Sequence, residues 1–563
     1  MGNPLSTIFL AAAAAAFAAP GLAGDPVVEL PTYVVTGTRI PPPPEFWRYA
    51  VAPGFEFLSD LSEAETRDRI ADFIRFHRAV DVVWPLIRIN AQAPATVIFC
   101  AGTERFAPFA PEGTPRESLG GTISLSMQDH EQAAMVVNLE AARAGAADGA
   151  PTDDYIQRLL RTEYVHFLFS RIEPAPPGWM AEGFTELFLA MDYSGNQIGF
   201  APWPDPTDLS ARKALAARIK AAPGRPLSSW IGDPDFQAGV RHGRVLSFAA
   251  FFSAAQAGSA DLGGPASAWD CQCLEFVHLC LFGEGGRYRK GLALLALAAM
   301  HQPVTEDLFR QCFQLSYAEL QVVLWAYTDF SQDVGLKFPP PAAGPGADPD
   351  RVRLRTATDA EVGRIKGDAL RLAGHLEEAH LSLIAPYLRG ARDPQLLAAL
   401  GQEEAAAGKD ERARRFLEAA VAAKTTRARA YLDLARLRYA AARRAPAGPA
   451  GHLAAAQWSQ VLDLLLAART LKPPLQGTYD LLAEGWEQAP GPPTLDQLSV
   501  VVEGVRLFPE DLDLIYRSAR LCAAAGFAQS AVTLAQFGLD RSANAADRER
   551  FAQLRASLPV PPK

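Results

Sequence analysis

A short pattern that recurs in the second half of this 563-residue chain constrains its fold more than any other feature. The pattern is Ala-Gly, four residues of any type, and then Ala; it begins at Ala373 and recurs 34 residues later at Ala407 and again at Ala525. Leu400 and Leu434 have the same 34-residue separation. Glycine suits a tight turn between helices, and alanine suits positions where two helices touch. The pattern therefore predicts a stack of antiparallel helix pairs.

The period and the placement of the small residues resemble tetratricopeptide repeats. A Pro, Gly and Ala-rich linker is predicted over residues 338–350, and helical repeats over residues 351–563. The pattern is weaker between residues 441 and 511, where Pro and Gly are inserted. Solenoids of this type expose a concave surface that commonly binds a peptide or protein, so the resemblance implies such a partner. The alternative is that the repeats only extend and stabilise the preceding domain.

A second motif, in the first half of the chain, contains candidate metal-binding and catalytic residues. Apolar residues at helical spacing predict a helix over residues 152–169, and Thr162, Glu163 and His166 lie on neighbouring strips of it. In the H-E-x-x-H arrangement, two histidines four residues apart bind Zn²⁺, and the glutamate between them is the general base. Here the glutamate and the second histidine are present, and Thr162 stands where the first histidine would be.

A Pro-Pro-Gly turn follows, and a second helix is predicted over residues 179–191, with Glu182 and Glu186 one turn apart. Fifteen residues separate His166 from Glu182, which is enough chain for a helix end, a turn and a return. We therefore expect two antiparallel helices that bring Glu182 close to His166 and Glu163.

The two segments together resemble the metal-site helices of gluzincin metallopeptidases, most closely secreted peptidase-MA-like domains without an assigned function. The resemblance covers about residues 46–330 and includes a Gly-Trp-Met-Ala-Glu-Gly stretch in the second helix. It implies these roles: zinc ligands His166 and Glu182, general base Glu163, and a supporting carboxylate Glu186. Thr162 departs from the family pattern, in which a histidine binds the metal at this position.

The substitution at Thr162 leaves two functions open. A threonine hydroxyl is a poor zinc donor, and without firmly bound metal Glu163 has no activated water to deprotonate. The remaining candidates for a third ligand, His130, His242 and His278, lie at no recognisable ligand spacing. One function is an exported, non-catalytic pseudopeptidase and scaffold. The other is an active zinc peptidase that takes its third ligand from elsewhere, so enzyme activity and zinc binding both stay open.

The order of predicted elements indicates the fold class. Strands are predicted over residues 46–58, 96–100, 122–127 and 134–139, and a helix that begins with the Ser62–Glu65 capping box runs to residue 83. The pattern is helical over residues 209–330. The chain is therefore expected to form an α+β domain over residues 46–337, a small sheet plus helices, followed by an all-α solenoid, and to be mostly α overall.

The N-terminal segment predicts export. Residues 1–23 have the apolar run and small residues of a signal peptide, and residues 24–45 form an extended, Pro-rich arm. Part of this arm, residues 30–40, resembles a stretch near the mature N-termini of TonB-dependent receptors, which suggests a docking peptide or simply a β-prone spacer. We expect a periplasmic or extracellular protein. No later segment is apolar enough to predict a transmembrane helix.

Charge and cysteine content exclude other classes. The formal net charge is −9 and no basic tract occurs, so a nucleic-acid partner is not expected. Six cysteines in 563 residues are too sparse for a disulfide scaffold, and buried thiols are expected, with at most one disulfide.

Overall fold

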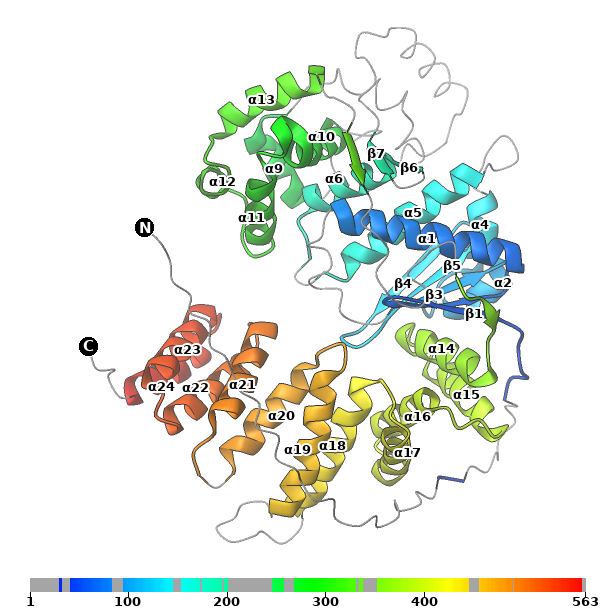
Figure 1. The fold of residues 1–563 in the computed structure, drawn as a ribbon, viewed down its shortest axis with the longest axis vertical. Helices are drawn as coiled ribbons and strands as arrows, with labels where there is room; N and C mark the ends of the chain where they lie inside the picture. Colours follow the sequence, from blue (N-terminus) through cyan, green and yellow to red (C-terminus); the bar gives the residue numbers. More distant parts are fainter. Residues whose placement is uncertain are drawn as a thin grey trace.

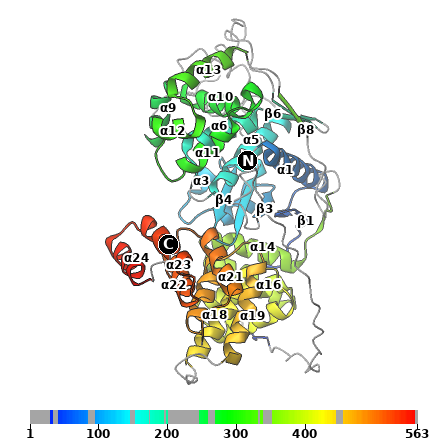
Figure 2. The same cartoon turned by 60° about the vertical axis from the view of Figure 1, so that its left-hand side comes forward.

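The computed structural model places a central sheet between a cluster of helices at one end and a helical solenoid at the other (Figures 1 and 2). The described residues are 30–32, 41–83, 95–144, 153–172, 175–194, 197–200, 246–257, 268–330, 334–337, 352–444, 455–489 and 491–558. The predicted signal peptide and linker lie outside these residues. Within them, no helix is both long and apolar enough to cross a membrane.

The central sheet is mixed, with the strand order β4-β5-β3-β2-β1-β9. Its strands are β1 (Arg48–Ala52), β2 (Phe55–Ser59), β3 (Ala95–Cys100), β4 (Ser124–Gln128), β5 (Ala133–Asn138) and β9 (Arg355–Thr356). The pairs β2–β3 and β3–β5 are parallel, and the other pairs are antiparallel. The single strand predicted over residues 46–58 is in fact a hairpin, because Gly54 adopts φ +82° and turns the chain between β1 and β2.

Helices cover both faces of this sheet. Helices α1 (Glu63–Val83) and α5 (Asp153–Ser170) pack on one face against Val97 and Phe99 of β3. The alternate residues Ile98 and Cys100 point to the other face, as the two-residue period of a strand requires. That second face is covered by short segments, α2 (Thr103–Phe106), η2 (Ala107–Phe109) and α3 (Arg116–Leu119), and by the first helix of the solenoid.

The end cluster packs around α6 and α10. It contains α6 (Gly178–Leu189), α9 (Phe248–Ala257), α10 (Ala268–Phe282), η5 (Gly283–Gly285), α11 (Arg289–Ala299), α12 (Glu306–Phe313), α13 (Tyr317–Phe330) and the sheet of β6 (Met191–Ser194), β7 (Gln197–Phe200) and β8 (Val334–Lys337). A Cβ at Gly183 would lie 2.5 Å from the Cys273 carbonyl oxygen, so glycine allows α6 to approach the α10 backbone. Cys100, Cys273, Cys280, Cys312 and Cys522 are free thiols.

The C-terminal part is a stack of helical hairpins. Its helices are α14 (Asp359–Leu372), α15 (Leu376–Leu388), α16 (Pro394–Ala406), α17 (Asp410–Ala422), α18 (Ala428–Arg444), α19 (Ala455–Thr470), α20 (Gln476–Glu487), α21 (Leu495–Leu507), α22 (Leu512–Ala524), α23 (Ala528–Arg541) and α24 (Ala545–Ser557). Consecutive helices pack as pairs, for example α14 with α15 and α16 with α17. The structure therefore confirms the predicted tetratricopeptide-like architecture.

The small residues of the repeat have the predicted roles. Gly374, Gly408 and Gly526 lie at helix–helix turns with φ of +93°, +71° and +83°, a region that favours glycine. The alanines five residues later are buried: Ala379 is 3 % exposed, and Ala413 and Ala531 are fully buried. The repeat pattern was therefore a correct signal for hairpin geometry.

The solenoid begins against the central sheet. Strand β9, which follows the predicted linker, pairs with β1, and the Ala357 N–H donates to the Trp47 carbonyl oxygen at 2.8 Å. Helix α14 then covers the sheet face that contains Tyr49 and Ile98. Part of the N-terminal arm also contacts the solenoid, since the Pro31 carbonyl oxygen accepts a hydrogen bond from the Tyr387 hydroxyl at 2.7 Å. The two halves of the chain therefore share an apolar layer.

Candidate functional site

The first motif helix, α5, places its polar residues in different environments. The Thr162 hydroxyl donates to the carbonyl oxygen of Arg158, one turn earlier in the same helix, at 3.1 Å. Threonine hydroxyls commonly make this bond inside helices. His166 is exposed, and Glu163 is half-buried. The residue that replaces the expected histidine is therefore engaged with its own helix.

Glu163 is tied to the edge strand of the sheet. Its Oε2 accepts a hydrogen bond from the Ser124 hydroxyl at the start of β4. At the other end of β4, the Gln128 side-chain amide donates to the carbonyl oxygen of Ser170. These two bonds hold β4 alongside α5. No sequence pattern marks Ser124 or Gln128, because a polar residue in a strand does not reveal which later helix it meets.

The second motif helix, α6, packs against both α5 and α10. Glu182 is half-buried and Glu186 is 6 % exposed. Trp179 is almost fully buried, with its ring 5.8 Å from that of Phe252 and 5.4 Å from that of Phe276. The Gly-Trp-Met-Ala-Glu-Gly stretch therefore has a structural role: the tryptophan anchors α6, and Gly183 permits its contact with α10.

The described donors do not fit a catalytic zinc ion. Such an ion needs three protein donors and an open position for water. Thr162 uses its hydroxyl within the helix, and His166 faces solvent. Across the part of the chain that the structure describes, no group of three His, Cys, Asp or Glu side chains could hold a metal. The convergence of His166 and Glu182 stays a prediction.

The other histidines of the first domain have different surroundings. His278 is buried in α10, where its Nδ1 lies 2.7 Å from the Tyr327 hydroxyl. His130 is exposed in the turn between β4 and β5. His242 lies outside the described residues.

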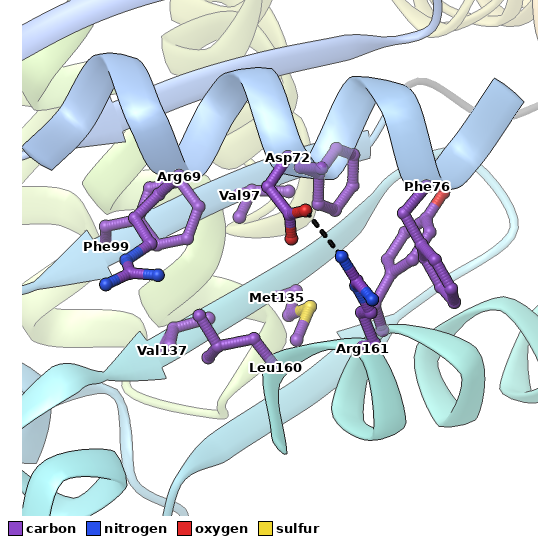
Figure 3. Close-up of a pocket in the computed structure, with 11 residues that line it drawn as sticks. Arg69, Asp72, Phe76, Val97, Phe99, Met135, Val137, Leu160 and Arg161 are labelled. Atoms are coloured by element: carbon purple, nitrogen blue, oxygen red, sulfur yellow. Dashed lines mark hydrogen bonds and ion pairs between the residues drawn. The ribbon is translucent and has the colours of Figure 1, made fainter. Parts of the chain in front are cut away.

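A small cavity lies between α1, the sheet and α5 (Figure 3). Its volume of about 20 Å³ gives room for about one water molecule. Beside it, Arg161 of α5 forms an ion pair with Asp72 of α1 at 2.8 Å, with both side chains largely buried. Nearby, the Tyr164 hydroxyl lies 2.6 Å from His77 Nδ1. Most of the lining is apolar and the cavity is small, so it offers no ligand site. The polar contacts beside it hold α5 against α1.

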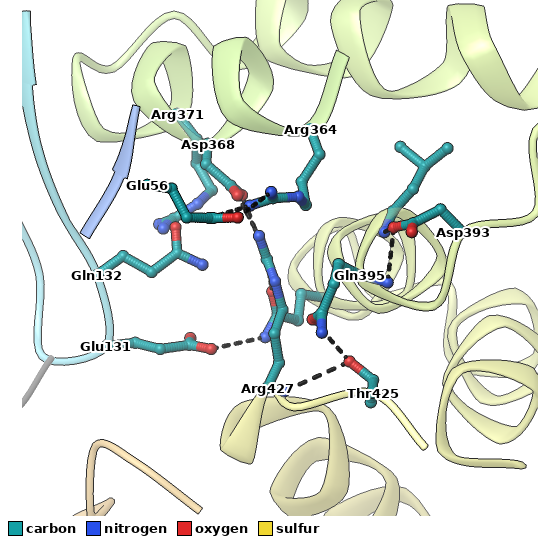
Figure 4. A network of polar contacts seen from close by, with 12 residues as sticks. Glu56, Glu131, Gln132, Arg364, Asp368, Arg371, Asp393, Gln395, Thr425 and Arg427 are labelled. Carbon is teal, nitrogen blue, oxygen red and sulfur yellow. Dashed lines mark hydrogen bonds and ion pairs between the residues drawn. The ribbon is translucent and has the colours of Figure 1, made fainter. Parts of the chain in front are cut away.

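The sheet and the solenoid meet in a network of charged side chains (Figure 4). Arg364 of α14 makes two hydrogen bonds to Glu56 of β2, at 2.9 and 2.8 Å. Burial raises the pKa of Glu56, but the Arg364 guanidinium outweighs burial and holds it below its usual value. Arg371 pairs with Asp129 at 2.8 Å, and Arg427 pairs with Asp368. Arg364, Arg427 and Asp368 are largely buried, and buried charges are stable only when paired in this way.

Glu131 belongs to the same network, but its pKa is raised, whereas that of Glu56 is lowered. It is 8 % exposed, and burial raises its pKa to about 7 although the Arg427 and Arg429 charges lower it. Its Oε1 accepts a hydrogen bond from the Gln402 side-chain amide at 3.1 Å. Sequence reasoning missed this cluster, since none of its members forms a motif.

A second hollow, of about 380 Å³, lies on the solenoid between α15, α16 and the start of α17. His380 lies in it with its Nδ1 2.9 Å from Glu403, and this contact raises the pKa of the imidazole. Leu376 at its rim is 65 % exposed.

Comparison with known proteins gives structural neighbours only. No protein-family model matches the chain, and no curated protein sequence matches it. Among solved structures, MamA is 17 % identical and covers 33 % of this chain and 96 % of its own, with a TM-score of 0.25. TTC0263, a TPR protein of Thermus thermophilus, is 16 % identical and covers 34 % of this chain and 96 % of its own, with a TM-score of 0.24. PilF of Pseudomonas aeruginosa is 14 % identical and covers 35 % and 88 %, with a TM-score of 0.25. The repeat architecture of this chain therefore rests on its own hairpins, turn glycines and buried alanines.

Proposed function

We propose that this protein is an exported, non-catalytic scaffold that binds a peptide or protein partner through its helical repeats. Its first domain is gluzincin-like, with a degenerate metal site that is kept as part of a binding surface. The proposal rests on Thr162. Its hydroxyl donates a hydrogen bond to the Arg158 carbonyl oxygen within α5, and this residue stands where an imidazole would bind zinc.

Glu163 supports the same conclusion. In an active site of this family the glutamate would deprotonate a metal-bound water. Here its carboxylate accepts a hydrogen bond from Ser124, and this bond joins α5 to β4. The residue therefore has a structural role that needs no metal.

One arrangement favours the alternative, an active zinc peptidase with Glu163 as general base and His166 and Glu182 as ligands. Strand β4 is the edge of the sheet and lies beside α5, where the gluzincin resemblance implies an edge strand that aligns a substrate. This function requires a third zinc donor, and His242 is one candidate outside the described residues.

Metal content separates the two functions. The full chain is purified without chelators, and its zinc is measured by elemental analysis together with hydrolysis of a fluorogenic peptide library. We expect substoichiometric zinc and no hydrolysis. One zinc per chain, with hydrolysis that Glu163→Gln and His242→Ala abolish, would establish the peptidase instead.

A further inference from the structure

The turn between β4 and β5 is a preorganised acidic loop. We name residues 129–132 the acidic tip. Asp129 Oδ1 accepts hydrogen bonds from the backbone N–H groups of Glu131 and Gln132, both at 2.8 Å. The Asp129 N–H donates to the Gln132 carbonyl oxygen at 2.9 Å. The tip therefore presents the carboxylates of Asp129 and Glu131 from a fixed backbone.

The acidic tip contacts the first two repeats of the solenoid and lies within reach of the charges of the third. Arg371 of α14 pairs with Asp129 at 2.8 Å, and Gln402 of α16 donates to Glu131 at 3.1 Å. Arg427 and Arg429, at the start of α18, lower the pKa of Glu131 through their charges. We name Arg371, Gln402, Arg427 and Arg429 the basic face.

The repeat register shows that this is one continuous face. Asp368 and Gln402 are 34 residues apart, so they occupy the same position in successive repeats. Both accept hydrogen bonds from Arg427, at 3.3 Å for Asp368 Oδ1 and 3.1 Å for Gln402 Oε1. Equivalent positions point to the same side of a solenoid, and here that side faces the sheet (Figure 4).

Ion pairing identifies what the basic face accepts. The basic face contains three arginines, and two of them pair within the solenoid: Arg427 with Asp368 and Arg429 with Asp433. Arg371 forms its ion pair with Asp129 of the acidic tip. The complement of the basic face is therefore a short peptide segment that carries a carboxylate at the position of Asp129 and a second carboxyl group at that of Glu131.

The acidic tip is held more weakly than the other contacts between the sheet and the solenoid. Arg364 is 8 % exposed and holds Glu56 through two hydrogen bonds, next to the apolar layer between the sheet and α14. By contrast, the side chains of Arg371 and Asp129 are 35 % and 33 % exposed, and pairs in such positions are screened by salt. Glu131 carries the cost of burial. The carboxylates of the tip can therefore exchange their partners while α14 stays on the sheet.

We propose that the basic face is a binding surface for an acidic peptide segment of a partner protein, and that the acidic tip occupies this surface within the chain until the partner competes for it. This inference rests on the proposed protein-binding role of the solenoid and adds the chemistry of its partner.

Competition with a peptide copy of the tip tests the proposal. The probe is a fluorescein-labelled peptide with the sequence of residues 126–133, and the proteins are the full chain and its Asp129→Asn/Glu131→Gln variant. A tethered competitor acts at an effective concentration in the millimolar range. We therefore expect the variant to bind the probe at least about tenfold more tightly than the wild type does, measured by fluorescence anisotropy at low salt. Adding Arg371→Gln to the variant should reverse most of the gain.

The control probe has Asn and Gln in place of Asp129 and Glu131. Weak binding of this probe to every protein supports the role of the carboxylates. Equal binding of the acidic probe to wild type and variant would overturn the proposal, because the tip would then not compete. Binding of both probes with the same affinity would overturn the acidic specificity and leave the protein-binding role of the solenoid standing. Circular dichroism of each variant shows that differences in binding do not come from unfolding.

Discussion

At the residue scale, Thr162 is the position at which α5 departs from the H-E-x-x-H pattern. The sequence was sufficient to place Thr162, Glu163 and His166 on one helix, because helical periodicity is a local property. It was not sufficient to find Ser124, since the contact of Ser124 with Glu163 joins residues 39 positions apart. Which polar residues a motif helix meets depends on how the sheet is assembled, and a single sequence does not encode this as a pattern.

Restoring the histidine tests how much of the metal site survives. If Thr162 is the only defect, Thr162→His should raise zinc affinity at least about tenfold, because loss of a supporting partner alone typically costs roughly ten- to a hundredfold. Competition with a chromogenic zinc chelator measures the change. Thr162→Val is the matched control, since it removes the hydroxyl without adding a donor. No gain with histidine would show that His166 and Glu182 no longer converge.

Glu131 predicts a pH dependence with a definite sign. Burial raises its pKa from 4.5 to about 7 in the folded protein, against the opposing charges of Arg427 and Arg429 and the Gln402 hydrogen bond, while Asp129 raises it further. A carboxyl with a raised folded-state pKa stabilises the fold fully below its unfolded pKa, and this contribution is lost as pH rises through about 7. The loss is on the order of 3 kcal/mol.

Urea denaturation of wild type and Glu131→Gln between pH 5 and 9 measures this contribution. The difference in midpoint between the two proteins should change as pH rises from about 5 to about 7 and level off above about 7, with the variant relatively more stable at high pH. A difference that is constant with pH would mean that Glu131 is ionised throughout.

At the element scale, helices were predicted better than strands. The predicted helix over residues 152–169 closely matches α5, and the repeat glycines fall at their turns. The sheet of β6, β7 and β8 was missed, because β8 lies more than 130 residues after β7 and contributes only four residues. Strand β9 has two residues and no sequence signal of its own. Short strands gain their stability from distant partners, so local patterns cannot reveal them.

Close helix contact in the repeats predicts a cost for adding one methyl group. A Cβ at Gly401 would lie 2.6 Å from Leu417, and Gly367 meets Leu383 at 2.7 Å one repeat earlier. Gly401→Ala should therefore destabilise the protein by about 1–3 kcal/mol, despite the higher helix propensity of alanine. The urea midpoint measures the change. Gly120→Ala is the matched control, because an added Cβ there meets nothing within 4 Å. An equal effect of both substitutions would contradict the packing argument.

At the scale of the whole molecule, the sequence predicts a linker over residues 338–350 between an α+β domain and a solenoid. The boundary positions stay a prediction, but contacts join the parts on either side of the linker. Strand β9 extends the sheet through β1, and Val362 and Ile365 of α14 pack against Tyr49 and Ile98. Composition marks a linker, but it does not show that the chain returns to the sheet after it.

A truncated protein that ends at Lys337 should therefore not fold as a stable monomer. It lacks β9 and α14, so it exposes apolar side chains of the cluster that α14 helps to cover, among them Trp47, Tyr49, Ile98, Phe106 and Val136. Leaving each large apolar side chain in water costs about 1.5–3 kcal/mol, and an apolar patch of this kind promotes association. The Glu56 carboxylate also loses Arg364.

The matched protein ends at Ala422, which retains β9 and the two hairpins α14 to α17. Size-exclusion chromatography and binding of an apolar dye compare the two proteins. We expect the longer protein to be monomeric with little dye binding, and the shorter one to bind dye and associate. A monomeric, cooperatively unfolding protein that ends at Lys337 would show that the sheet is stable without α14, and that the solenoid is a separate domain docked on a finished core. If the shorter protein instead binds dye and associates, the first hairpin of the solenoid is part of the domain that carries the candidate site. A partner on the basic face would then bind a surface continuous with that domain.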